Sequence, residues 1–181
     1  MRKITTAAIA GVMVVPAAGH AVGAASSDNG VTATYDGRKI DLADGWQGAQ
    51  ACAVLSASDV RCYDSQADMQ DALGASARQN PAVQLSPLAG CVPSGTFVTL
   101  YSDINFGGTS LSFQGTGSWT NLAPYGFDNA MESWTNTTNC NASVADGTGG
   151  SGAQLALGAH SSSSNVGTTW KNRASSILVA N

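Results

Sequence analysis

The sequence predicts a mainly β fold, and three observations support this class. Of the 181 residues, 43% are hydrophobic and only 11% are charged, which excludes a disordered polyelectrolyte and a coiled coil. Short runs of alternating apolar and polar residues, separated by Gly- and Ser-rich turns, are typical of β-strands. The last half of the chain contains an internal repeat of about 43 residues. Together they predict a compact, turn-rich protein with room for one ordinary domain or two small ones.

Residues 1–24 have the features of a secretory signal peptide. Arg2 and Lys3 give a positive start, Ile4–Ala18 is apolar, and small residues lead to a cleavage site that we place after Ala24. An uncleaved membrane anchor is the alternative, but the apolar run is short for a membrane span. Cleavage removes two of the eight basic residues and changes the formal charge to 6 − 12 = −6. We therefore expect a secreted protein that binds neither nucleic acid nor membrane.

The chain contains four cysteines, Cys52, Cys62, Cys91 and Cys140. In an oxidising compartment they form disulfides, and three pairings are possible. A hairpin centred at Ala57 would place Cys52 opposite Cys62, which favours that pair and leaves Cys91 for Cys140. Neither zinc binding nor thiol catalysis is expected, because only one histidine follows the signal peptide.

Residues 25–75 predict a small β-rich module with one short helix. The Asp36-Gly37 turn indicates a first hairpin, and the segment with the first two cysteines indicates a second. A helix capped by Asp64 or Ser65 is expected to end at Gly74. Most of the acidic residues lie in this module, which we interpret as a solvated face. Residues 76–90 are predicted to link it to a domain over residues 91–181.

The domain over residues 91–181 contains two copies of one pattern. Residues 101–113 align with 145–157 at a shift of 44, which matches Gly108 with Gly152 and Leu111 with Leu155. Residues 127–134 align with 170–177 at a shift of 43. One copy could not bury its own apolar face, so the repeat predicts two antiparallel four-stranded units around a shared core.

At these residues the chain resembles the βγ-crystallin superfamily. Tyr101, Phe106 and Gly108 match its motif of two aromatic residues followed by a glycine. More narrowly, the region is similar to secreted actinobacterial proteins of the streptomycete metalloproteinase-inhibitor family. The resemblance implies a double Greek-key domain. It also implies a non-enzymatic protein that inhibits an extracellular peptidase.

The superfamily resemblance also implies a place for calcium. Its calcium loops have two Asn or Asp residues, two variable residues, and Ser or Thr followed by Ser, and the hydroxyl of one loop completes the site of the other. Here Asp128 and Asn129 with Ser175 keep one such half. In the other, Glu132 replaces a hydroxyl and Lys171 replaces an oxygen ligand. A bound Ca²⁺ would use the first set, and the alternative is that these side chains only hold turns by local hydrogen bonds.

The inhibitor resemblance directs attention to the segment that joins the two copies. We predict an exposed binding loop over residues 140–151, with Cys140, Asn141 and Val144 as contact residues. The sequence departs from the family plan, because the cysteine at residue 91 is too distant in sequence to close a small ring with residue 140. A plain connection without a binding role is the alternative.

No catalytic residue is predicted. His160 lies next to the serines at residues 161–164, but no third group orients its imidazole. The acidic pair Asp68 and Asp71 falls on one exposed helix face. We expect a monomeric extracellular peptidase inhibitor. The alternative is a structural, calcium-binding or other ligand-binding module of the cell envelope.

Overall fold

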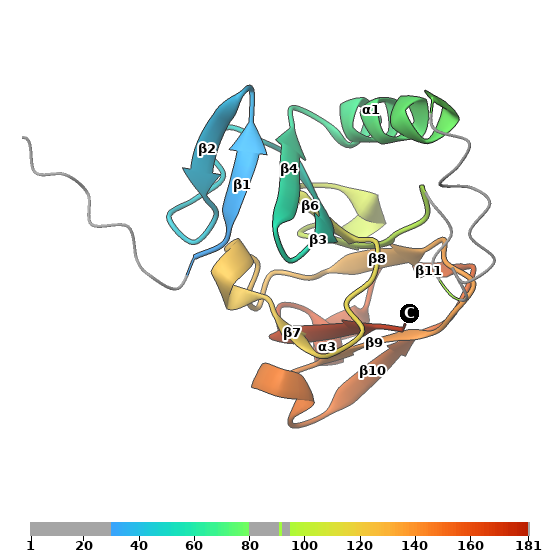
Figure 1. The fold of residues 1–181 in the computed structure, drawn as a ribbon. Coiled ribbons are helices and arrows are strands. Elements are labelled where there is room, and N and C mark those ends of the chain that lie inside the picture. Colours follow the sequence, from blue (N-terminus) through green and yellow to red (C-terminus); the bar gives the residue numbers. More distant parts are fainter. Residues whose placement is uncertain (1–29, 80–90, 92–94, 181) are drawn as a thin grey trace, which may run out of the picture.

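The computed structural model describes residues 30–79, 91 and 95–180. The signal peptide expected over residues 1–24 and the linker from residue 80 onward lie outside this range. The fold is mainly β, as predicted, with two sheets and one long helix (Figure 1). In the described part of the chain, no helix is long and apolar enough to cross a membrane.

The N-terminal strands form two antiparallel hairpins. The first contains β1 (Thr32–Tyr35) and β2 (Arg38–Asp41), and the second contains β3 (Ala51–Ser56) and β4 (Asp59–Tyr63). β1 also pairs in parallel with β4, which unites them in one sheet. Both predicted hairpins are therefore present. In the first turn, Asp36 and Gly37 take the left-handed backbone that a two-residue hairpin loop requires (φ 49° and 72°).

Helix α1 (Gln66–Gln79) is longer than predicted. It begins as expected after Ser65, whose Oγ accepts a hydrogen bond from the Asp68 N–H at 3.1 Å. The expected end at Gly74 is wrong, because the helix continues to Gln79 and includes the first residues of the predicted linker. A glycine inside a helix costs only about 1 kcal/mol relative to alanine, and the Ala-rich sequence that follows favours helix.

The C-terminal half contains two Greek-key motifs. The first has β5 (Val98–Tyr101), β6 (Ser110–Phe113), β7 (Thr120–Asn121) and β8 (Ser133–Asn136); the second has β9 (Ala142–Ala145), β10 (Gln154–Leu157), β11 (Ser161–Ser163) and β12 (Ser176–Val179). In each motif the first, second and fourth strands share a sheet, while the third pairs with the fourth strand of the other motif. This exchange ties the two copies together and confirms the predicted double Greek-key fold.

The two copies also agree in backbone detail. Gly108 and Gly152, matched at a shift of 44, both have a left-handed backbone (φ 71° and 79°). Ser133 Oγ donates to the Asp103 carbonyl at 2.6 Å and accepts from the Phe106 N–H at 3.1 Å. The second copy repeats both bonds around the serine hydroxyl at residue 176. The sequence repeat is therefore a structural repeat.

The N-terminal module and the first motif share a sheet. β3 pairs in parallel with β6, which gives an eight-stranded sheet in the order β11-β8-β5-β6-β3-β4-β1-β2. One buried cluster contains Ile40 and Leu42 of the module together with Leu100, Phe113 and Ile177 of the two motifs. A smaller cluster lies on the other face, where Met69 and Leu73 of α1 pack on Phe97. The module thus covers one edge of the double Greek key.

Both disulfides have the expected pairing. Cys52 and Cys62 lie directly opposite each other in the β3–β4 hairpin, with 4.0 Å between their Cα atoms. Cys91 and Cys140 join the segment before β5 to the connection between the two motifs. The described residues contain no free cysteine.

Candidate functional site

The connection between the two motifs, residues 137–141, forms an exposed loop that we call the inter-motif loop. Thr137, Asn139 and Asn141 are exposed. The disulfide from Cys140 to Cys91 and a hydrogen bond from Asn139 N–H to the Cys91 carbonyl (2.9 Å) anchor the loop. The disulfide does not close a small ring, in line with the sequence analysis. It nevertheless fixes the loop, because the two cysteines meet in space.

The carbonyl of Cys140 points into the protein. It accepts hydrogen bonds from Asn136 Nδ2 and from Thr138 Oγ1, both at 2.9 Å, and these two donor residues are buried. A substrate-like bond must offer its carbonyl to the peptidase. In this conformation the bond between Cys140 and Asn141 does not do so. A partner would therefore meet the exposed side chains of the inter-motif loop.

Val144 does not belong to any loop, and its predicted role as a contact residue is wrong. It lies in the centre of β9, paired with Leu155 of β10 on one side and Ile177 of β12 on the other. Its side chain is fully buried in the core. The sequence around it is apolar and alternating, which is typical of a strand, and only residues 140 and 141 remain accessible from the predicted set.

Two hollows adjoin the inter-motif loop and meet at Thr135 and Thr137. One, of about 350 Å³, continues from these two threonines to His160 and Ser162 of the second motif. The other, of about 490 Å³, lies between α1 and the outer face of β5 and β8. Sequence reasoning missed both, because they form where separate elements meet.

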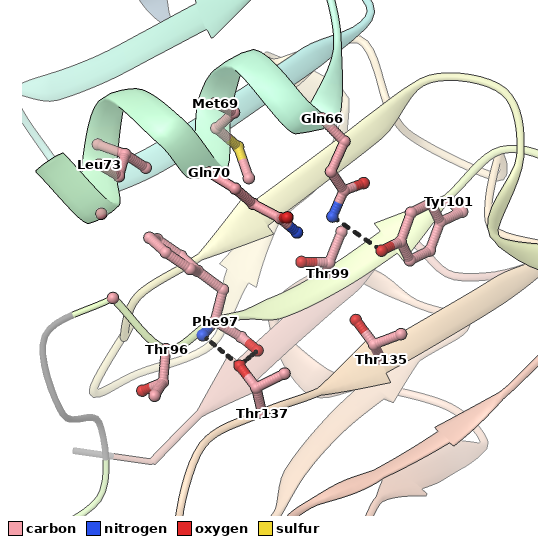
Figure 2. Close-up of a pocket in the computed structure, with 12 residues that line it drawn as sticks. Gln66, Met69, Gln70, Leu73, Thr96, Phe97, Thr99, Tyr101, Thr135 and Thr137 are labelled. Carbon is pink, nitrogen blue, oxygen red and sulfur yellow. Dashed lines mark hydrogen bonds between the residues drawn. The ribbon is translucent and has the colours of Figure 1, made fainter.

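The hollow under α1 has an uncharged, mostly apolar lining that includes Met69, Leu73 and Phe97, with a few polar side chains among them (Figure 2). Gln66 Nε2 donates to the hydroxyl of Tyr101 at 2.9 Å, and Thr137 Oγ1 accepts from the Phe97 N–H at 2.9 Å. Gln70 lies one helical turn from Gln66 and reaches into the same space (Figure 2). The i, i+4 spacing of the two glutamines was the one signal in the sequence. This lining suits an uncharged, mostly apolar group with a few hydrogen-bonding atoms, and it contains no acid–base pair for catalysis.

The structure brings the predicted calcium ligands together. The Asn129 N–H donates to the Ala174 carbonyl at 2.9 Å, and Ser175 Oγ donates to Asn129 Oδ1 at 3.5 Å. Asp128 lies beside them and accepts from Asn129 Nδ2 at 2.8 Å. This set offers carboxylate, amide and hydroxyl oxygens, the donors that Ca²⁺ prefers, but only one formal negative charge. The chemistry of these donor atoms fits a Ca²⁺ ion that is bound with low affinity.

The equivalent position in the other half holds an ion pair. Lys171 Nζ lies 2.9 Å from Glu132 Oε1, and the Glu132 side chain is only 10% exposed. The Asn172 N–H donates to the Met131 carbonyl at 3.0 Å, the counterpart of the Asn129 bond. The two residues that depart from the calcium pattern therefore contact each other. The sequence contained the signal, since opposite charges occupy the two positions that meet across the pseudo-twofold.

The residues weighed for catalysis do not form a catalytic group. His160 Nε2 lies 3.0 Å from Asn139 Oδ1, and Asp68 accepts a hydrogen bond from Ser65 Oγ at the start of α1. Within residues 30–79, 91 and 95–180, no cluster of three or more His, Cys, Asp or Glu side chains could hold a metal ion. The histidine instead braces the inter-motif loop against the second motif.

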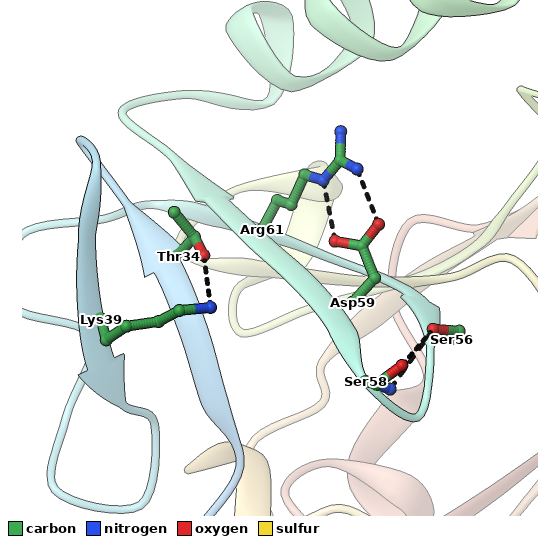
Figure 3. A network of polar contacts seen from close by, with 6 residues as sticks. All are labelled: Thr34, Lys39, Ser56, Ser58, Asp59 and Arg61. Carbon is green, nitrogen blue, oxygen red and sulfur yellow. Dashed lines mark hydrogen bonds and ion pairs between the residues drawn. The ribbon is translucent and has the colours of Figure 1, made fainter.

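Polar contacts hold part of the acidic module (Figure 3). Arg61 donates two hydrogen bonds to Asp59, at 2.8 and 2.7 Å, and these bonds lower the pKa of the Asp59 carboxyl. The hydrogen bond from Tyr35 to Asp64, at 2.5 Å, raises the pKa of the Tyr35 phenol. Both pairs lie at the surface, as expected for a solvated face.

The family model for peptidase inhibitor family I36 matches residues 93–146, which span the first Greek-key motif and β9. No curated protein matches the sequence.

Similar solved structures are βγ-crystallin domains. One from Flavobacterium johnsoniae is 28% identical, with 46% of this chain and 94% of that chain covered and a TM-score of 0.39. One from Clostridium beijerinckii is 23% identical, with 46% and 97% covered and a TM-score of 0.41. A βγ-crystallin from Ciona intestinalis is 24% identical, with 46% and 98% covered and a TM-score of 0.39.

Proposed function

We propose that the protein is a secreted, non-enzymatic inhibitor of an extracellular peptidase, because residues 93–146 match the model of peptidase inhibitor family I36. A metallopeptidase is the first target to test. The proposal rests on the family match together with one structural observation. That observation is the fixed, exposed inter-motif loop at residues 137–141.

A rigid loop favours inhibition for a physical reason. Binding a flexible loop costs conformational entropy, and a loop already held in one conformation avoids most of that cost. Here the disulfide at Cys140, the two hydrogen bonds to its carbonyl, and the bond from the Ala159 N–H to Asn141 Oδ1 (3.0 Å) hold the backbone. The exposed side chains of Asn139 and Asn141 are then presented in a fixed arrangement.

The hollow next to the loop offers a second contact. It is lined by hydroxyl, amide and imidazole groups, including those of Thr135, His160 and Ser161, and has about 350 Å³ of space. A side chain of the peptidase that enters this hollow would displace water and bury area next to the loop. Because the Cys140 carbonyl is turned inward, we propose that the loop blocks the peptidase without being cleaved.

The test is titration of secreted metallo- and serine peptidases with the processed chain. We expect stoichiometric inhibition of at least one metallopeptidase. The double variant Asn139→Arg/Asn141→Arg adds bulk and charge to the loop and also removes the asparagine oxygens that bond to His160 and to the Ala159 N–H. It should weaken that inhibition at least tenfold, as expected when a contact worth more than about 1.4 kcal/mol is lost.

The matched control is Ala57→Arg, which adds the same side chain to the exposed turn between β3 and β4, outside the binding loop predicted over residues 140–151. It should inhibit like the parent chain. Absence of inhibition across the panel would remove the proposed function. Equal inhibition by the loop variant and the control would support the inhibitory function but would exclude the inter-motif loop as the binding site.

A calcium-binding role is the second candidate, favoured by the convergence of Asp128, Asn129 and Ser175. A ligand that binds only the folded state raises its stability. We therefore expect a higher melting temperature with millimolar Ca²⁺ than with a chelator, and no such difference for Asp128→Ala. If the melting temperature of the parent chain is the same with Ca²⁺ and with a chelator, these residues have a structural role only.

A further inference from the structure

One sheet edge in the second motif is open. The sheet order β10-β9-β12-β7 puts β10 at an edge, and no strand in the described part of the chain pairs with its outer side. Figure 1 shows β10 at the margin of that sheet. An open edge presents unpaired backbone N–H and C=O groups to a further strand.

The corresponding edge of the first motif is covered. β6 is the counterpart of β10, since Ser110 aligns with Gln154 at a shift of 44. β3 pairs with the outer side of β6, and the Ser110 N–H donates to the Gln50 carbonyl at 2.8 Å. The same edge therefore receives an additional strand in one copy and lacks it in the other.

The register identifies the free groups on β10. The Asp146 N–H donates to the Ala153 carbonyl at 3.0 Å, and hydrogen-bonded pairs alternate along an antiparallel ladder. Leu155 and the residue at 157 therefore bond to β9, while the backbone groups of Gln154 and Ala156 point outward. In β6 the outward backbone groups belong to the equivalent residues, and there they pair with β3.

Nothing in the sequence of β10 protects this edge. Natural edge strands are shielded by charged residues, proline or short length. Edge strand β2 carries Arg38, Lys39 and Asp41, while β7 has only two residues and β11 three. β10 has four residues, and the sequence contains no charged side chain between Asp146 and Lys171. Two copies of this edge would approach without like-charge repulsion.

We propose that β10 pairs with β10 of a second copy, antiparallel, about a twofold axis at Leu155. In this register Gln154 faces Ala156 of the second copy on both sides of the axis, so the outward N–H and C=O groups all find partners. The half-buried Leu155 side chains then lie opposite each other and cover their remaining apolar surface. A weak dimer with one continuous sheet replaces the monomer expected from the sequence.

Sedimentation of the processed chain across a concentration series tests the proposal. We expect a reversible rise from the monomer mass toward the dimer mass, and slower amide exchange at Gln154 and Ala156 at high concentration. Ala156→Pro removes the outward N–H without touching the ladder to β9. It should weaken dimerisation at least tenfold, because half of the inter-copy bonds use this N–H.

Ala156→Thr is the matched control, since it changes the side chain but keeps the N–H, and it should dimerise like the parent chain. Gln154→Lys adds a charge to the edge and should also weaken association, which covers the case in which the proline variant fails to fold. A chain that stays monomeric at every concentration would refute the proposal. So would a dimer that both edge variants leave unchanged. Peptidase inhibition is a separate readout, so either proposal can fail alone.

Discussion

At the scale of single residues, Lys171 and Glu132 show how two departures from a metal-binding pattern compensate each other. The carboxylate of Glu132 is nearly buried, and the ammonium of Lys171 reaches it at 2.9 Å. A cation fixed to the chain thus bridges the two motifs at the place where the resemblance would put a metal ion. This half of the domain needs no ion to neutralise its buried carboxylate.

We expect Lys171→Met to lower the free energy of unfolding by about 1–2 kcal/mol. Removing one partner of a fully buried pair costs more, but Lys171 is 54% exposed and solvent screens part of the interaction. Denaturant unfolding of the parent, Lys171→Met, Glu132→Gln and the double variant gives the coupling between the two side chains. A coupling near zero would show that the pair does not bridge the motifs energetically.

Ser110 is a second informative residue. Among the described side chains, its hydroxyl is the buried polar atom without a hydrogen-bond partner. A buried, unsatisfied hydroxyl is costly, so Ser110→Ala should raise the free energy of unfolding by about 1 kcal/mol. Thermal melting measures the change, and Ser112→Ala is the control, because that hydroxyl is bonded to Thr99 at 2.8 Å and its loss should destabilise the chain.

At the scale of elements, the β3–β4 hairpin depends on pH through Asp59. Arg61 lowers the pKa of this carboxyl in the folded state, so folding favours its charged form. That contribution is present above the ordinary pKa of 3.8 and is lost as the pH falls through the lower folded value. Both side chains are over 40% exposed, which keeps the effect small.

Asp59→Asn should therefore be less stable than the parent chain at neutral pH, and the difference should shrink as the pH falls below the ordinary carboxyl pKa of 3.8. Melting temperatures over a pH series check this. The variant Asp36→Asn is a suitable control, because the Asp36 carboxylate lies 3.9 Å from Arg38 in a highly exposed pair. A constant difference between Asp59→Asn and the parent at all pH values would exclude the carboxylate as its source.

At the scale of the whole molecule, the N-terminal module stabilises the double Greek key by covering the β6 edge. Truncation to residues 91–181 would expose that edge and remove Ile40 and Leu42 from the common core. We expect the truncated chain to melt at least 10 °C lower or to aggregate, since a loss of a few kcal/mol shifts the melting temperature by that order. A truncated chain that melts like the full one would show that the double Greek key does not depend on the module for its stability.

The sequence predicted the parts of this protein that local chemistry controls. The Asp36-Gly37 turn and the alternation of the strands were sufficient for two hairpins, and the repeat of residues 101–113 in 145–157 was sufficient for two four-stranded units. The double Greek key itself was implied by the resemblance to βγ-crystallins. The cross-strand placement of Cys52 and Cys62 followed from the hairpin itself. The calcium-like residues Asp128, Asn129 and Ser175 were also identified, and the fold brings them together.

Local pattern was insufficient where a residue depends on distant partners. The exposed position predicted for Val144 was wrong, because two strands from later in the chain enclose it. Gly74 was read as a helix end, although the helix tolerates it.

The sequence by itself determined the class of fold and the repeat, and it favoured the cysteine pairing that the structure has, because turns, alternation and spacing are properties of neighbouring residues. Only the tertiary structure decided that β3 covers β6 while β10 stays open, and that α1 packs on Phe97. These contacts join segments far apart in the chain, and their energy comes from packing and pairing that no local pattern encodes.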